Sequence, residues 1–252
     1  MGCGSWGRTA VLAGSLAVGL RLPFVHDLPY TDEGGLLVVA GHWHAGGPFL
    51  YGPLFVDRPP LLLAFFRLAD DLGGVVSLRL LGLGLVAVAV ACATRAGTLL
   101  GGTRGAVAAS LTCAALLADP LLGTREVDAE TVGVPLVLLA AVLALQGLRR
   151  DRTGFLWFAG SGAAGSAALL VKQNLADGVV FTVALVLAGG LASHTGSRRT
   201  AGALGCVVLG AAIPGAAAIA WSTTATGAEG LFYSLYGFRI ASSNTLFAQP
   251  SA

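Results

Sequence analysis

The sequence predicts an all-α polytopic membrane protein, and three observations lead to this fold class. Of its 252 residues 55% are hydrophobic, and only 11% are charged. The mean hydropathy is high, at +0.79. Several apolar runs are long enough to cross a hydrocarbon layer of about 30 Å, which takes roughly 20 residues of helix. We therefore expect about seven transmembrane helices and a large first outer loop that carries short interfacial helices.

Apolar segments of the required length recur along the whole chain, so a single transmembrane domain over residues 1–252 is expected. The predicted spans are residues 9–26, 77–97, 105–122, 131–148, 154–171, 176–193 and 201–221. They leave outer loops at residues 27–76 and 123–130 and an outer tail at residues 222–252. Arg8 precedes the first apolar core as in a signal peptide, but no small-residue cleavage site follows, which favours an uncleaved anchor.

The arginines predict which side each loop occupies. With a cytoplasmic amino terminus, the inner loops collect Arg8, Arg95, Arg104, Arg149, Arg150, Arg152, Arg198 and Arg199, as the positive-inside rule requires. Nearly all acidic residues then fall at the outer face, with Asp151 as the exception. The rule concerns positive charge, so these one-sided acids indicate a functional outer surface. We expect a multi-pass plasma-membrane protein whose active loops lie outside.

A polar segment between Tyr30 and Leu61 directly follows the first apolar run and gathers acids, histidines, aromatics and an Arg-Pro-Pro turn. Asp32 and Glu33 open a stretch that can lie along the membrane interface with its acids facing a cleft. Asp57 and Arg58 precede two prolines, which predict the start of a short helix. The free N–H groups and positive dipole end of such a helix suit a phosphate, and the Arg58 guanidinium adds donors.

These features resemble the GT-C membrane glycosyltransferases, above all the protein O-mannosyltransferase and aminoarabinose transferase group. The resemblance rests on the Asp-Glu pair after the first span, the large first outer loop, the DRPPL motif before the second span and the acidic second outer loop TREVDAET. It covers about residues 9–180. Relatives in this group carry further helices and often a soluble outer domain, so the resemblance implies that these residues correspond to the amino-terminal part of such a protein.

The resemblance implies a reaction and its catalytic residues. A sugar on a polyprenyl-phosphate donor would pass, with inversion, to a hydroxyl of a protein, glycan or lipid acceptor at the outer face. Asp32 would be the catalytic base, with Glu33 beside it. Asp128 would be the catalytic acid of the second outer loop that helps hold the sugar. Glu130 is a further candidate, although two residues so spaced would face different ways on a helix.

The leaving phosphate needs positive charge or a metal ion around it. The resemblance places Arg58 as the phosphate-binding cation and Asp57 as an acid that can hold a divalent metal, with Mg, Mn or Zn as candidates. Lys172 is the only lysine among the 15 basic residues. Its compact ammonium suits a second phosphate contact, and the alternative is a snorkelling cation at a helix end.

His42 and His44 flank Trp43 in the first outer loop. With Asp57 or Glu33 they could complete a metal site, because imidazole and carboxylate together suit zinc or manganese. On a helix, however, residues two apart point in different directions, and Trp43 is typical of an interfacial anchor. Both interpretations stay open from the sequence.

Two other functional classes compete with the transferase. A transporter for a lipid or small solute would need ionisable groups deep in the spans, and the apolar cores are nearly free of them. A catalytically inactive, truncated scaffold would make the loop acids dispensable. Nucleic-acid binding is excluded, because the net charge of +2 comes from scattered basic residues. The four cysteines show no metal-site spacing.

Overall fold

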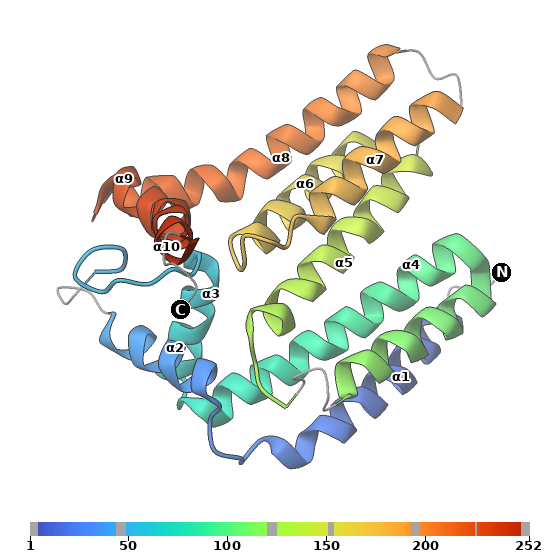
Figure 1. The fold of residues 1–252 in the computed structure, drawn as a ribbon. Coiled ribbons are helices and arrows are strands. Elements are labelled where there is room, and N and C mark those ends of the chain that lie inside the picture. Colours follow the sequence, from blue (N-terminus) through green and yellow to red (C-terminus); the bar gives the residue numbers. More distant parts are fainter. Residues whose placement is uncertain are drawn as a thin grey trace.

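The computed structural model describes residues 5–43, 49–119, 125–150, 154–192, 197–224 and 226–247. Over these ranges the regular secondary structure is helical and contains no β-strand, which confirms the predicted all-α class (Figure 1). The six principal helices are α1 (Ser5–Arg21), α4 (Val75–Ala118), α5 (Ala129–Leu148), α6 (Gly154–Leu169), α7 (Asp177–Ala192) and α8 (Ser197–Thr223). Each predicted span falls on one of them, and α4 covers two.

Three helices in the described ranges are long and apolar enough to cross a membrane. They comprise Val75–Ala118, Ala129–Leu148 and Ser197–Ser222, whereas Asp177–Ala192 is apolar but shorter. The chain is thus consistent with a membrane-embedded helical protein. The full number of seven crossings stays a prediction.

The longest helix, α4, reverses direction at a pair of glycines. Gly101 and Gly102 have non-helical backbone angles, with φ at +60° for Gly102, a conformation that a residue with a Cβ rarely adopts. The two arms run back beside each other (Figure 1), and they touch at Gly97 and Gly105. A Cβ on Gly97 would lie 2.2 Å from the Gly105 carbonyl oxygen. The spans predicted at residues 77–97 and 105–122 are therefore the arms of one helical hairpin.

The predicted first outer loop contains two short helices, α2 (Thr31–His42) and α3 (Pro60–Asp71), after a single 3-10 turn, η1 (Leu22–Phe24). As the prolines predicted, α3 begins at Pro60 with Pro59 as its N-cap. This arrangement leaves Asp57 and Arg58 directly before the helix start. The apolar side chains of α2 and α3 pack into the core, so both helices belong to the folded body.

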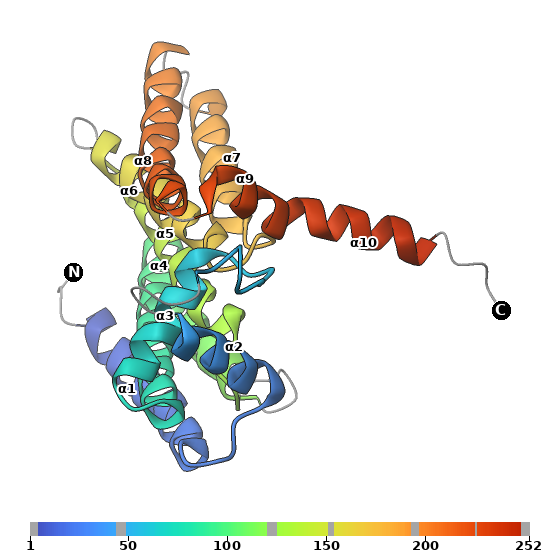
Figure 2. The same cartoon turned by 90° about the vertical axis from the view of Figure 1, so that its left-hand side faces the viewer.

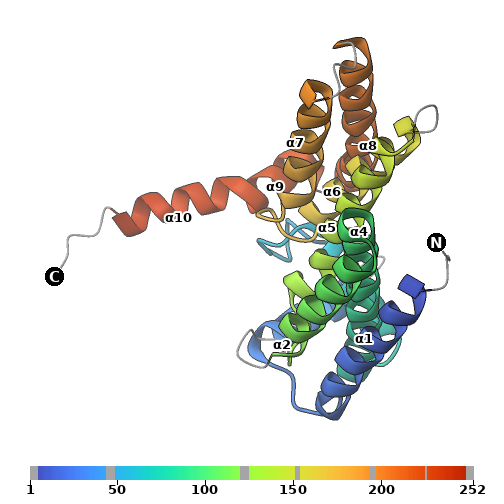
Figure 3. The same ribbon diagram turned by 90° about the vertical axis from the view of Figure 1, so that its right-hand side faces the viewer.

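The last elements are α9 (Gly227–Phe232), the π-helical turn η3 (Tyr233–Gly237) and α10 (Phe238–Phe247). Viewed from either side, α10 extends away from the principal helices (Figures 2 and 3). Large apolar residues along this segment, including Phe232, Tyr236 and Ile240, are exposed.

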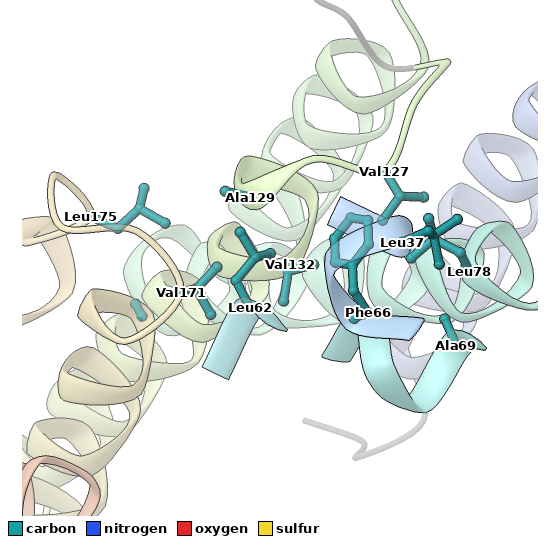
Figure 4. Packing of buried hydrophobic residues seen from close by; sticks show 12 residues of the cluster. Leu37, Leu62, Phe66, Ala69, Leu78, Val127, Ala129, Val132, Val171 and Leu175 are labelled. Carbon is teal, nitrogen blue, oxygen red and sulfur yellow. The ribbon is translucent and has the colours of Figure 1, made fainter. Parts of the chain in front are cut away.

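A buried cluster joins α2, α3 and the first arm of α4 to the connections before α5 and after α6. Figure 4 shows Leu37, Phe66 and Leu78 meeting Val127, with Val171 and Leu175 farther along the same cluster. The cluster brings together segments more than 90 residues apart in the sequence. We call this side of the molecule, where α5 begins and α6 ends, the acidic end.

Successive helices run in opposite directions, so the predicted outer and inner loops lie at opposite ends of the bundle. The first residues of α5 and α7 and the last residues of α4 and α6 lie at the acidic end with α2 and α3 (Figure 1). The opposite end, which we call the arginine end, holds the turn of α4, the ends of α5 and α7, and the starts of α1, α6 and α8 (Figure 1). This separation follows the charge pattern from which sidedness was predicted. Which end faces the cytoplasm stays a prediction.

Candidate functional site

Glu33 is a buried structural acid in this fold. Its side chain is 0% exposed and pairs with Arg79 of α4, with 2.7 Å between Oε2 and Nη2. Glu33 Oε1 also accepts the backbone N–H of Val127 at 2.7 Å, and Oε2 accepts that of Tyr30 at 3.0 Å. The prediction that both acids of α2 face a cleft does not hold for Glu33, because its partners lie inside the bundle. Its part in catalysis stays a prediction.

Asp32, the preceding residue, points outward. Its side chain is 69% exposed and lies 4.0 Å from the Arg58 guanidinium. Arg58 also approaches Asp57, with 3.5 Å between Nη1 and Oδ2, and the same Asp57 oxygen accepts from Arg239 of α10 at 3.2 Å. The predicted acids Asp32 and Asp57 are therefore brought together by the predicted cation Arg58, at a water-accessible surface.

The segment that carries Asp57 and Arg58 is held from two sides. The Tyr51 hydroxyl donates to the Arg58 carbonyl at 2.8 Å, and burial raises the pKa of that hydroxyl far above its usual range. On the other side, the α6–α7 connection contacts the same segment. Gln173 Nε2 donates to the Asp57 carbonyl at 3.2 Å, and the Leu61 N–H donates to the Leu170 carbonyl at 3.0 Å.

Asp128 is the N-cap of α5. Its Oδ1 accepts the Thr131 N–H at 2.8 Å and the Thr131 hydroxyl at 2.9 Å. Burial is the main cause that raises the Asp128 pKa, against the lowering effect of the Thr131 bonds, and a side-chain hydrogen bond with Glu130 adds to the increase. The expectation that Asp128 and Glu130 face different ways applied to a helical segment. That condition is not met, because Asp128 lies before the helix and has extended backbone angles.

Lys172 forms an ion pair with Glu130. The lysine of the α6–α7 connection is thus joined to the first turn of α5, next to the N-cap Asp128. Because Gln173 in turn contacts the Asp57 backbone, a chain of polar contacts runs from Asp128 to the Asp57–Arg58 segment. Lys172 is one quarter exposed, so an incoming phosphate can reach its ammonium.

The acids of both predicted outer loops share one electrostatic region. The pKa of Glu126 is raised first by burial and then by the negative charges of Asp128, Glu33 and Asp32. These acids come from α2 and from the connection that precedes α5. The positive charge of Arg79 opposes this increase. Interacting titratable groups with shifted pKa values are common at binding and catalytic sites.

A large cavity opens next to Asp128. Its volume is about 680 Å³, and it is lined by both arms of α4, by α5 and by the end of α1. Its wall is mostly apolar, with Cys113, Leu116 and Leu138 among its residues, and its polar lining consists of Arg21, Asp128, Glu130 and two threonines. The Arg21 guanidinium in this lining donates to the carbonyls of Leu117 and Glu126, each at 3.0 Å.

The metal-site candidates do not converge. No group of three or more His, Cys, Asp or Glu side chains gathers anywhere in the described residues. His42 is exposed and bonds its own helix, with 2.7 Å between Nδ1 and the Val38 carbonyl. It follows Asp32 by ten residues, about 15 Å along a helix. His44 lies outside the described residues.

The surroundings of Asp57 fit a divalent metal poorly. Two guanidinium groups, of Arg58 and Arg239, approach its Oδ2 within 3.5 Å. A divalent cation there would replace these partners and meet their positive charge. The donor set is therefore better suited to anionic phosphate than to a metal ion, and a metal requirement stays a prediction.

Several residues of the site region were not singled out from the sequence. Arg21 and Arg79 carried a usable signal, because a charged residue near the end of an apolar span is costly and usually has a partner. Arg239 carried none, since it lies 182 positions after its partner Asp57. Tyr51 was one aromatic among several in the loop.

No family model, curated protein or solved structure matches the chain. What the site does must therefore be argued from its own residues and cavity.

Proposed function

We propose that the protein is a glycosyltransferase that moves a sugar from a polyprenyl-phosphate donor to an acceptor hydroxyl at the outer face of the plasma membrane. The observation that carries the proposal is the cavity of about 680 Å³, whose apolar wall leads to Asp128 and Glu130. One cavity thus offers surface for a lipid chain and carboxylates for a polar headgroup. The resemblance of the DRPPL and TREVDAET segments to GT-C transferases supports the same activity.

The donor is expected to bind along this cavity. Its isoprenoid chain lies against the α4 and α5 side chains, where burial of apolar surface contributes about 25 cal/mol per Å². The sugar hydroxyls donate to Asp128 and Glu130. The phosphate lies near Lys172, which exchanges its contact with Glu130 for the donor, and near Arg58. Arginine forms paired hydrogen bonds to phosphate, and lysine acts as a point charge.

Transfer is a single displacement at the anomeric carbon. Asp32 takes the proton of the acceptor hydroxyl while the oxygen of that hydroxyl forms the new bond to the anomeric carbon. The bond to the phosphate oxygen breaks, and the polyprenyl phosphate leaves with the electron pair, stabilised by Arg58 and Lys172. Asp32 suits this role because its side chain is exposed to an approaching acceptor and lies 4.0 Å from the Arg58 guanidinium, which would bind the leaving phosphate. Glu33 holds α2 in place.

The test is sugar transfer in membranes that contain the full chain and a radiolabelled polyprenyl-phosphate sugar. Asp32→Asn is expected to lower incorporation by at least about a hundredfold, as for loss of a general base. Arg58→Ala removes phosphate contacts and is expected to raise the donor concentration needed. Asp71→Asn is the matched control, because Asp71 is an exposed acid paired with Arg67 of its own helix.

Equal incorporation by wild type, Asp32→Asn and Arg58→Ala would exclude the transferase as proposed. Donor binding, measured separately with the same labelled lipid, distinguishes the competing classes. A scaffold binds no donor and transfers nothing. A transporter moves the lipid-linked sugar between leaflets without releasing polyprenyl phosphate.

A further inference from the structure

A second cavity lies at the arginine end, on the other side of the molecule from the candidate site. Its volume is about 460 Å³, and it is enclosed by the end of α5, the start of α6, the end of α7 and the start of α8. Phe155, Phe158 and Val186 form part of its apolar wall. Glycosyl transfer as proposed uses none of these residues.

Two arginines line this cavity, and the described residues that enclose it include no acid. Arg150 follows α5, and its guanidinium lies over the Trp157 ring, 5.5 Å from the ring centroid. Arg199 comes from the first turn of α8 and reaches toward the α5–α6 connection, with 3.5 Å between its Nη2 and the Arg150 carbonyl. The guanidinium of one arginine thus meets the backbone of the other at the same rim.

The cavity lies at the ends of its helices, and this position indicates what kind of ligand it binds. Two of the four helices around it, α5 and α8, are long and apolar enough to cross a membrane. Their ends at this rim would lie at the level of the lipid headgroups. Basic pockets between membrane helices at this level bind acidic lipid headgroups. Phenylalanine and valine side chains below the rim complement an acyl chain, which a soluble anion lacks.

We propose that this cavity binds one acidic phospholipid of the adjacent leaflet. The headgroup phosphate accepts hydrogen bonds from Arg150 and Arg199, and an acyl chain lies against Phe155, Phe158 and Val186. The lipid would bridge Arg150 after α5 and Arg199 of α8 and so link the two helical pairs. The site is independent of the proposed glycosyl transfer, since the two cavities lie at opposite ends of the bundle.

Trp157 provides a local probe for the test. The full chain is placed in phosphatidylcholine vesicles that contain a rising fraction of brominated phosphatidylglycerol, and quenching of tryptophan fluorescence is followed. Brominated phosphatidylcholine at the same fractions is the neutral-lipid arm. Trp157→Phe is expected to remove most of the lipid-specific quenching. Quenching that persists in Trp157→Phe would place the lipid elsewhere and overturn the proposal.

The matched pair of variants is Arg199→Gln and Arg198→Gln. They remove the same charge from neighbouring positions of α8, but Arg198 is exposed and does not line the cavity. Arg199→Gln is expected to need at least about fivefold more brominated phosphatidylglycerol for half quenching. This is the change in affinity expected when one arginine contact with an acidic lipid, worth about 1 kcal/mol, is lost. Arg198→Gln should match wild type. Arg150→Gln serves as a second cavity variant.

Three results would overturn the proposal. Equal losses in Arg198→Gln and Arg199→Gln would indicate diffuse attraction without a site. Equal quenching by the neutral and acidic brominated lipids would remove headgroup recognition. Displacement of brominated phosphatidylglycerol by millimolar inorganic phosphate would identify a soluble anion as the ligand. Thermal unfolding of each variant in phosphatidylcholine alone checks that the fold is retained.

Discussion

The carboxylate of Glu33 and the guanidinium of Arg79 form a buried ion pair that ties α2 to the first arm of α4, with exposures of 0% and 3%. Arg79 also donates to the carbonyls of Phe24 and Leu28, which belong to the connection between α1 and α2. The partners of both charges are thus supplied inside the fold. Because Glu33 is fixed inward, its neighbour Asp32 is presented outward toward Arg58.

Arg79→Met is expected to destabilise the protein strongly. It leaves the Glu33 carboxylate buried without its partner, which typically costs about 3–5 kcal/mol. Unfolding in detergent, followed by circular dichroism, measures the change. Asp71→Asn, which breaks the exposed contact with Arg67, is expected to cost at most about 1 kcal/mol. A loss for Arg79→Met no larger than that of Asp71→Asn would contradict the structural role of the pair.

Gly97→Ala is expected to separate the arms of the α4 hairpin. The new Cβ would meet the Gly105 carbonyl oxygen at 2.2 Å, a clash with backbone that cannot be relieved by a side-chain rotation. Overpacking of this kind costs about 1–3 kcal/mol. Gly84→Ala is the control in the same helix, since a Cβ there meets nothing within 4 Å. We expect a lower unfolding temperature for Gly97→Ala alone.

Thr112→Trp is expected to impair donor use by filling the cavity beside Asp128. Thr112 lines that cavity and is itself exposed, so the fold can accommodate the change. Ala115→Trp places the same side chain on an exposed position of α4 outside the cavity wall. Labelled polyprenyl-phosphate sugar should bind Ala115→Trp as wild type and Thr112→Trp at least about tenfold more weakly, as for loss of 1.4 kcal/mol. Equal binding would argue against the cavity as the donor site.

Asp128→Asn is expected to change how stability depends on pH. The folded protein raises the pKa of Asp128, chiefly through burial, so the folded state binds this proton more tightly than the unfolded chain. The associated stability is present below the unfolded pKa of about 3.9 and is lost as the pH rises through the folded value. Asparagine retains a capping oxygen but does not ionise.

Relative to wild type, Asp128→Asn should therefore gain stability between about pH 4 and pH 7. Chemical unfolding at both pH values, with Asp71→Asn as the reference for loss of one exposed acid, measures the difference. A stability difference between Asp128→Asn and wild type that is the same at both values would show that burial does not affect this carboxyl group.

Helix positions could be predicted from the sequence because apolar runs of span length occupy most of the chain. The predicted spans at residues 131–148 and 201–221 fall within α5 and α8, and the double proline marked the start of α3. The hairpin within α4 was predicted as two spans, since glycines and arginines interrupt the apolar run there. These signals are local, and each depends on residues close in sequence.

The arrangement of the candidate site was only partly predictable. Proximity of Asp57 to Arg58 follows from adjacency, but the approach of Asp32 to Arg58 and of Lys172 to Glu130 depends on packing. Asp32 and Glu33 look equivalent in sequence, yet one is exposed and the other fully buried. Consecutive side chains on a helix point about 100° apart. The packing of α2 therefore decided which of the two acids faces inward.

The sequence by itself determined that this is an apolar, all-helical chain whose acids gather in the predicted outer loops, because hydrophobicity and charge are properties of the residues. Tertiary structure alone decided that Glu33 is a core partner of Arg79, that Asp128 and Glu130 share one cavity, and that Arg239 reaches Asp57. These outcomes depend on how helices distant in sequence pack. A buried charge is stable only where the fold brings a partner to it.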